Sequence, residues 1–262
     1  MKRLLQLLVL LAAFASMAAR AGSACVQRAP DANSVMQALE LAQKSKLALD
    51  ASGAQVALIA RVGQDLSKYH LRYSHMAFIW RQHPGERWNV VHELNRCGTA
   101  ESSLYDEGLG NFFLDNMFVY ETMLVIPDSE TQAHLAVLLS SDAYLRLHAS
   151  QYNMVSYPFS TKYQNSNQWV LETLAAASAR DVAVTNRVQA QSWLSAVGYQ
   201  PTTLDIPMAT RLGADLFSAN VAFDDHPFDR RMAGKIDTVT VESVVRFIEG
   251  RNQIVQKMNI VN

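Results

Sequence analysis

The chain has few cysteines and no excess of either charge. Cys25 and Cys97 are the only cysteines among 262 residues, and neither lies in a CxxC or Cys/His pattern. Structural zinc sites use four such ligands at close spacing, so we predict no metal site. The formal net charge of −1 excludes the basic footprint that is typical of proteins binding nucleic acid or an anionic membrane. We therefore expect no nucleic-acid partner.

Phosphate-binding glycine patterns are also missing. The sequence contains no G-x-G-x-x-G and no P-loop motif, which counts against a nucleotide ligand, and we predict no cofactor. After the N-terminal segment, no apolar run approaches the length of a bilayer span, so we expect no transmembrane span in the mature chain. Hydrophobic residues make up 49% and charged residues 18% of the sequence, which is the composition of an ordinary globular chain.

The N-terminus has the order of a secretory signal peptide. Lys2 and Arg3 precede the apolar stretch LLQLLVLLAAFASMAA, and small residues that suit cleavage follow, up to Ala21 or Ala24. We predict a signal peptide over residues 1–24 and a mature chain that is periplasmic or secreted. An uncleaved membrane anchor is the alternative, because the apolar stretch is near the lower length limit for spanning.

The two cysteines can form a disulfide in an exported chain. Pairing of Cys25 with Cys97 would tie the mature N-terminus to the middle of the domain, and we favour it over two separate thiols. Lipidation of Cys25 is disfavoured, because Gly22 stands where a lipoprotein signal carries a leucine-like residue.

The pattern of apolar residues predicts a single α+β domain over residues 25–262. Short β-branched or apolar runs predict strands over 55–62, 74–80, 88–94 and 116–126, the middle two forming a hairpin. Apolar periodicity and capping residues predict helices over 34–49, 129–148, 168–179, 187–197 and 209–218. Residues 95–111 are expected to form a loop, and the tail fits either a strand and a helix or one long helix. We predict one antiparallel sheet flanked by helices, with a helical C-terminal extension.

His75 opens the apolar strand SHMAFIW. A histidine can act as a general base because its pKa lies near neutrality. Strand alternation puts Ser74 and Met76 on one face of the strand and His75 and Ala77 on the other. An isolated histidine in this position is more often structural than catalytic, so His75 alone does not decide the function.

Ser166 stands between Asn165 and Asn167 at the start of a predicted helix. Asn165 with Gln168 three residues later fits a capping box in form, which gives these side chains a structural role. The same position would suit a nucleophile, because the positive end of the helix dipole and the free amides can stabilise an oxyanion. The motif fits both roles.

Four segments taken together resemble a known arrangement: QVALIARVG, SHMAFIW, VVHEL and YQNSNQWVLE. Their order is similar to that of circularly permuted papain-like proteins of the NlpC/P60 superfamily, such as the YiiX-type and lecithin retinol acyltransferase-like branches. The resemblance implies a permuted papain-like fold, with His75 as the base, Glu93 (or His92) as the orienting residue and Ser166 as the nucleophile. It also implies candidates for the oxyanion site or the substrate groove: Asn165, Asn167, Tyr163 and Trp169.

The chain departs from that superfamily at Ser166, where the family normally carries cysteine. Serine needs a well-placed base and oxyanion site more than cysteine does, because its proton must be removed during attack. Two functions therefore stay open. One is an amidase, esterase or acyl hydrolase acting on cell-envelope substrates; the other is a catalytically inactive binding protein that recognises a peptide, glycan or lipid.

The exported chain as a whole also resembles a bacterial family, DUF2145. The segments that carry this resemblance are NRCGTAESSLYDEGLGNFFLD, PFSTKYQNSNQWVLE and FDDHP. The family resemblance implies no particular reaction, so the function has to be argued from the site.

Overall fold

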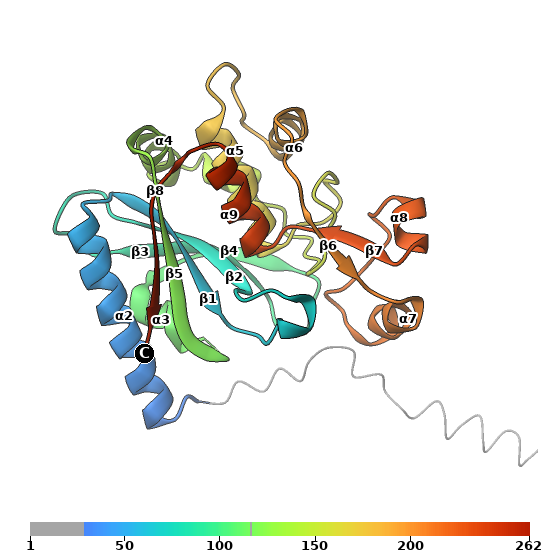
Figure 1. The fold of residues 1–262 in the computed structure, drawn as a ribbon, viewed down its shortest axis with the longest axis horizontal. Coiled ribbons are helices and arrows are strands. Elements are labelled where there is room, and N and C mark those ends of the chain that lie inside the picture. Colours follow the sequence, from blue (N-terminus) through green and yellow to red (C-terminus); the bar gives the residue numbers. More distant parts are fainter. Residues whose placement is uncertain (1–28, 116) are drawn as a thin grey trace, which may run out of the picture.

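The computed structural model describes residues 29–115 and 117–262 (Figure 1). Its main sheet has six antiparallel strands in the order β4–β3–β2–β1–β5–β8. The strands of this sheet are β1 (Val56–Val62), β2 (His75–Trp80), β3 (Asn89–Asn95), β4 (Ser102–Gly108), β5 (Val119–Pro127) and β8 (Ile254–Val261). Helices cover both faces, so the predicted α+β class with an antiparallel sheet flanked by helices is confirmed.

The helices divide between the two faces of the main sheet (Figure 1). On one face lie α2 (Ala32–Ser52) and α3 (Leu109–Leu114). On the other face lie α4 (Ser129–Leu139), α5 (Ser166–Ser178), α6 (Arg187–Ala196) and α9 (Val241–Gly250). We call the two apolar layers between sheet and helices the α2 core and the α5 core.

Strand β1 shows how the sequence builds both cores. All seven of its side chains are buried. Ala57 and Ile59 pack in the α2 core, whereas Leu58 and Ala60 pack in the α5 core. A central strand that is covered on both faces has no solvent side, so apart from Arg61 it is apolar instead of alternating.

Helix α2 is confirmed, and it begins two residues before and ends three residues after the predicted range of 34–49. The Asp31 side chain accepts a hydrogen bond from the Ser34 amide at 2.9 Å, which satisfies one of the free amides of the first turn. Gly53 ends the helix in the left-handed region, with φ of 71°, where glycine has no Cβ penalty.

The predicted loop over 95–111 is wrong, because this segment contains β4 and the start of α3. Strand β4 lies at the edge of the sheet, and among the described strands β3 is its one partner. An edge strand has solvent on one side, so its sequence, SSLYDEG, lacks the apolar character on which the strand prediction depended. The predicted helix over 129–148 is also too long: α4 ends at Leu139, and a short 3-10 turn, Tyr144–Leu147, follows.

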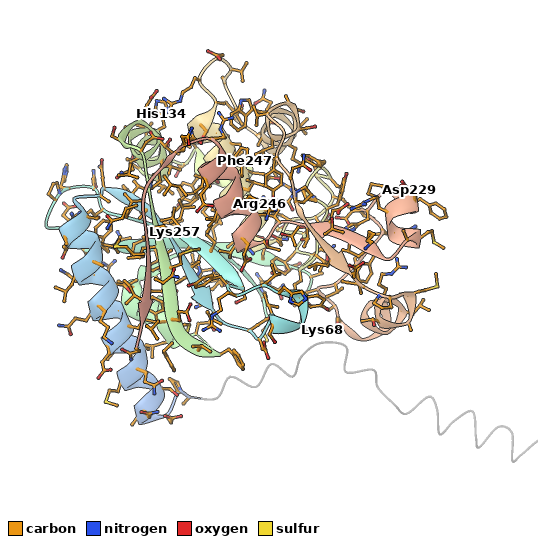
Figure 2. The ribbon with its side chains drawn as sticks, viewed as in Figure 1. Lys68, His134, Asp229, Arg246, Phe247 and Lys257 are labelled. Carbon is orange, nitrogen blue, oxygen red and sulfur yellow. The ribbon has the colours of Figure 1, made fainter. Side chains whose placement is uncertain are left out.

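The C-terminal third is more mixed than a helical extension. Besides α6 and α9 it contains α7 (Met208–Phe217), α8 (Phe228–Met232) and a two-stranded sheet of β6 (Thr202–Asp205) and β7 (Lys235–Thr238). After α9 the chain returns to the main sheet as β8, which pairs with β5. Phe247 of α9 is buried in the α5 core while the adjacent Arg246 is exposed (Figure 2).

Within the described ranges, no helix combines the length and apolarity that crossing a bilayer requires. The predicted signal peptide, residues 1–24, lies outside the described residues.

Candidate functional site

Asn165 caps the helix that begins at Ser166. Its side-chain oxygen accepts a hydrogen bond from the Gln168 amide at 2.8 Å, and its amide group donates to the Thr238 hydroxyl at 3.0 Å. The predicted cap is confirmed, but a full capping box does not form, because the Gln168 side chain bonds to Glu172 instead. Asn165 is 3% exposed, and both ends of its carboxamide form hydrogen bonds. It therefore ties α5 to the end of β7 and does not line an open groove.

Asn167 joins the start of α5 to the start of β2. Its side-chain oxygen accepts a hydrogen bond from the Met76 amide at 3.0 Å, and its amide group donates to the Ser74 carbonyl at 3.4 Å. These two backbone groups flank His75 in the chain. The structure therefore brings the Ser166 and His75 segments together, as the resemblance implied.

The side chain of His75 nevertheless points into the α2 core. Met76 and Phe78 pack in the α5 core, and Ala77 packs in the α2 core. His75 shares the face of Ala77, and its ring lies against Phe112 of α3, with ring centroids 6.0 Å apart. The imidazole thus lies on the face of the sheet that α5 does not cover.

A buried polar chain holds His75 there. Its Nε2 atom lies 2.9 Å from Nδ1 of His92, and Nε2 of His92 lies 3.1 Å from a carboxylate oxygen of Glu107. Burial lowers the pKa of His75 well below its usual value, and the nearby Arg61 and His92 lower it further. Both histidines are therefore neutral at physiological pH, since burial also lowers the pKa of His92 despite Glu107.

Glu93, the first choice for orienting His75, lies on the other face. As the neighbour of His92 on β3 it points toward α5 by strand alternation. It is fully buried, and burial raises its pKa to about 8, with the nearby Glu172 raising it further while Ser102 lowers it. The residue that contacts His75 is His92, the alternative that the sequence left open.

Ser166 has neutral neighbours. It is 7% exposed, and its hydroxyl interacts with that of Tyr152. Burial raises the pKa of Tyr152, and Glu93 raises it further. A tyrosine that stays protonated and a carboxyl group that is mostly protonated at neutral pH are poor acceptors for the proton of a serine.

The two aromatic groove candidates differ in their surroundings. Trp169 is fully buried and packs on Phe78 with ring centroids 5.5 Å apart, so it belongs to the α5 core and not to a groove. Tyr163 is half-buried, and its carbonyl accepts a hydrogen bond from Arg187 at 2.8 Å.

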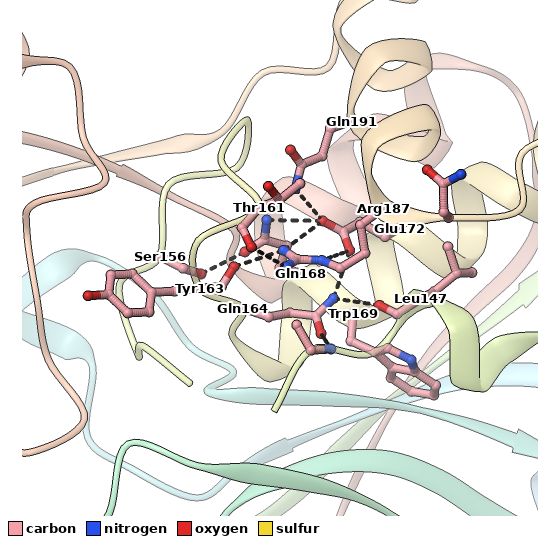
Figure 3. Close-up of polar contacts among 12 residues, drawn as sticks. Leu147, Ser156, Thr161, Tyr163, Gln164, Gln168, Trp169, Glu172, Arg187 and Gln191 are labelled. Atoms are coloured by element: carbon pink, nitrogen blue, oxygen red, sulfur yellow. Dashed lines mark hydrogen bonds and ion pairs between the residues drawn. The ribbon is translucent and has the colours of Figure 1, made fainter. Parts of the chain in front are cut away.

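A buried ion pair close to Tyr163 was not predicted from the sequence (Figure 3). Glu172 of α5 is 0% exposed and pairs with Arg187 of α6 at 2.8 Å. Three glutamine side chains donate further hydrogen bonds to the Glu172 carboxylate: Gln164 at 2.7 Å, Gln168 at 3.1 Å and Gln191 at 2.8 Å. The available signal was Glu172 itself, the one charged residue of the stretch WVLETLAAA. A glutamate is costly to bury without a partner.

Two further sequence predictions concern cysteine and metal. Cys97 is disulfide-bonded, but Cys25 lies outside the described residues, so the Cys25–Cys97 pair stays a prediction. Within the described part of the chain, no group of three or more His, Cys, Asp or Glu side chains is placed to hold a metal ion.

Two surface cavities lie away from Ser166 and His75. One, of about 550 Å³, is lined by Phe159, Thr161, Val188, Gln191, Ser192 and Ser195. The other, of about 530 Å³, lies beside α7 and α8, and its lining includes Met208, Arg211, Leu212, Phe223, Arg231 and Met232.

Comparison with known proteins gives one family match. A family described as "Uncharacterized protein conserved in bacteria (DUF2145)" matches residues 48–248, a range that contains His75, Glu93 and Ser166. No curated protein and no solved structure matches the chain.

Proposed function

The chain belongs to the bacterial family DUF2145, and from its geometry we propose that it is a catalytically inactive binding protein of the cell envelope. It would recognise a peptide, glycan or lipid after export to the periplasm or beyond. The observation that carries the proposal is the placement of the two key side chains. His75 contacts His92 and Phe112 in the α2 core, whereas Ser166 begins a helix that packs on the other face of the sheet.

The chemistry around Ser166 also favours an inactive site. A serine nucleophile depends on a base within hydrogen-bond reach and on a second group that orients the base. Tyr152 interacts with the Ser166 hydroxyl and Glu93 acts electrostatically on Tyr152, and burial raises the pKa values of both. His75 is neutral, but its Nε2 atom is bound to His92. Catalysis would therefore require both the sheet and the histidine pair to rearrange.

We further propose that the core is a permuted papain-like scaffold that has lost its nucleophile. The support is the order of its parts. Strands β1, β2 and β3 are consecutive neighbours, His75 is the first residue of β2, and the Asn165-Ser166 pair opens the helix packed on β2 and β3. Replacement of cysteine by serine at the helix start would remove the reactive thiolate and leave the framework intact.

Hydrolysis is the rival function, and one observation favours it. Ser166 is the first residue of a 13-residue helix, where the helix dipole would stabilise negative charge on an oxyanion. The two functions make opposite predictions for the reactivity of the Ser166 hydroxyl.

The test is labelling of the purified protein with a fluorophosphonate probe, which reacts only with activated serines. We expect no labelling of the parent above that of Ser166→Ala. Ser178→Ala, which removes another buried serine of α5, is the matched control. Labelling of the parent that is lost in Ser166→Ala and kept in Ser178→Ala would overturn the proposal in favour of a serine hydrolase.

A thiol probe on Ser166→Cys tests the scaffold separately. Rapid labelling above the background of the parent would support a papain-like framework whose helix start lowers the pKa of a thiol without help from His75. Labelling no faster than that of an ordinary thiol would count against the papain-like scaffold, while it would leave the binding function standing.

A further inference from the structure

The cavity beside α7 and α8 contains a buried arginine. Arg211 of α7 lines this cavity of about 530 Å³ and is 6% exposed. Its Nε atom has no hydrogen-bond partner. Its guanidinium group lies over the Phe223 ring, 5.9 Å from the ring centroid, and forms no ion pair within the described residues.

Arg211 differs in this respect from the other buried arginines. Three arginines of the described chain are buried to a similar extent, and each pairs with a carboxylate: Arg61 with Asp115, Arg81 with Asp50 and Arg187 with Glu172. A guanidinium group stays charged at all physiological pH values. A buried charge is costly unless it is paired and hydrogen-bonded. Because no carboxylate among the described residues pairs with Arg211, its guanidinium group can pair with an anion that enters the cavity.

The other charges at the cavity increase this preference. Arg231 of α8 brings a second positive charge, and its guanidinium group donates one hydrogen bond to the Phe223 carbonyl at 3.3 Å. The cavity also contains Asp224, but its carboxylate pairs with Lys162. The net charge of the lining thus favours an anion.

The rest of the lining is apolar and open at the surface. Met208 is 49%, Leu212 58% and Met232 50% exposed, and Phe228 of α8 is 69% exposed nearby. Figure 2 shows α8, with Asp229 labelled, and α7 together at one end of the molecule. Methionine side chains adapt to apolar ligands of different shape, and a cavity of this size is typical of small-molecule sites.

We propose that this cavity binds a single-chain amphiphile with a small anionic head. The head pairs with the guanidinium group of Arg211, and the acyl chain lies along Met208, Leu212 and Met232. The planar guanidinium fork suits a carboxylate or phosphate head equally well. This inference rests on the proposed binding function, because it names the class of ligand and the place where it binds.

The test is calorimetric titration of the full chain with dodecanoate, at concentrations below micelle formation. We expect saturable binding by the parent and at least tenfold weaker binding by Arg211→Met, which keeps the apolar length and removes the charge. Arg87→Met is the matched control, because it removes the same charge from an exposed turn, and its affinity should equal that of the parent. Equal affinity of the parent and Arg211→Met, or no binding by the parent, would overturn the proposal.

Variation of the ligand identifies the head and the chain. Dodecanol keeps the chain without the charge, and acetate keeps the charge without the chain; we expect both to bind at least tenfold more weakly than dodecanoate. Comparable binding of either would contradict an amphiphile site. Dodecyl phosphate distinguishes the two heads, and whichever anion binds more tightly supports the proposal and names the head.

Two controls keep the result interpretable. Arg211→Lys keeps the charge and should retain more affinity than Arg211→Met, and an unchanged thermal midpoint of each variant shows that it is folded. If either variant fails to fold, the comparison of dodecanoate with dodecanol on the parent still decides the proposal.

Sedimentation with phosphatidylglycerol vesicles tests a membrane-facing surface instead. If the parent and Arg211→Met co-sediment to the same extent and dodecanoate does not bind, the amphiphile site is overturned in favour of a membrane-facing surface. Failure of the amphiphile site would leave the fluorophosphonate result unaffected, so the two proposals can fail separately.

Discussion

The Nε2 atom of His75 lies 2.9 Å from the Nδ1 atom of His92, and Glu107 lies 3.1 Å from the opposite nitrogen of His92. A neutral imidazole has one donor nitrogen and one acceptor nitrogen. A His92 tautomer with its proton on Nε2, the nitrogen that faces Glu107, leaves Nδ1 to accept a hydrogen bond from Nε2–H of His75. The proton on Nε2 of His75 is then directed into the protein interior and away from α5.

The histidine pair should make the fold sensitive to acid. Burial holds the pKa of both histidines below that of the unfolded chain, so the unfolded state binds more protons once the pH falls below about 6.5. We expect the free energy of unfolding to decrease between pH 7 and pH 5, by up to about 1.4 kcal/mol per pH unit for each histidine. Urea unfolding of the parent and of His75→Phe at a series of pH values measures this slope.

The control for this prediction is a histidine with a different environment. His83 lies exposed on the turn after β2, so His83→Gln should keep the slope of the parent, whereas His75→Phe should have a shallower one. A slope that is the same in all three proteins would mean that the buried pair does not set the acid sensitivity.

The sequence predicted the local parts of this region but not their relative placement. The strand that His75 opens and the cap formed by Asn165 depend on neighbours within a few residues, so their signals lie in the sequence itself. Strand alternation also separated His75 from Met76. Which face α5 would cover depends on hydrogen bonds such as the one between Asn167 and Met76, which are 91 residues apart, and no local pattern contains that information.

The partner of Glu172 was unpredictable for the same reason. Glu172 lies on α5 and Arg187 on α6, and a pair between two helices leaves no periodic signal. Edge strand β4 was missed because one of its sides faces solvent, which removes the apolar run that a strand prediction uses. Most secondary-structure elements and the family could therefore be predicted from the sequence. The buried polar contacts could not, because they depend on how distant elements pack.

Glu93 should destabilise the protein increasingly as the pH rises. Its pKa is about 8 in the folded state and near 4.5 when unfolded, so the folded state binds more protons between these values and stability falls with rising pH. Glu93→Gln keeps the shape of the neutral carboxyl and removes the titration. We expect the variant to gain on the order of 1–3 kcal/mol over the parent at pH 8 and much less at pH 5, measured by urea unfolding.

A carboxyl group at the surface provides the comparison for Glu93. Glu101 is exposed and pairs with Arg96 at 3.0 Å, so Glu101→Gln should change the free energy of unfolding by less than about 0.5 kcal/mol at either pH. A gain in Glu93→Gln that does not grow with pH would argue against the titration of this carboxyl group.

Asn165 should matter more to stability than an ordinary helix cap. It caps α5 and also bonds to Thr238 of β7, whereas Asn186 caps α6 through the Gln189 amide at 3.0 Å. A lost cap costs about 1 kcal/mol, and a lost buried hydrogen bond costs about 1 kcal/mol more. We expect Asn165→Ala to lose about 2 kcal/mol and Asn186→Ala about 1 kcal/mol by chemical denaturation.

An aspartate variant separates the two contributions of Asn165. Asn165→Asp keeps the cap acceptor and removes the donor to Thr238, so its stability should lie between those of the parent and Asn165→Ala. Equal losses in Asn165→Ala and Asn186→Ala would mean that the link to β7 adds nothing.

Breaking the ion pair between Arg187 and Glu172 should cause the largest loss in the free energy of unfolding. Both side chains are buried, 8% and 0% exposed respectively, and removal of one partner leaves the other charge buried and uncompensated. Such losses amount to about 3–5 kcal/mol. Arg187→Met should therefore lose about this much in urea unfolding at pH 7.5, whereas Arg96→Met, which breaks an exposed pair, should lose less than about 1 kcal/mol.

The loss in Arg187→Met should also depend on pH. Burial already raises the pKa of Glu172, and Arg187 is the main group that lowers it, so the variant raises that pKa further. A carboxyl group whose pKa is higher in the folded state loses stability as the pH rises above its unfolded value. The loss should be smaller at pH 5 than at pH 7.5, and Glu172→Met in the same chain should recover part of it, because it removes the unpaired charge. A loss that is equal at both pH values and is not recovered in the double variant would indicate that Arg187 stabilises the fold through packing alone.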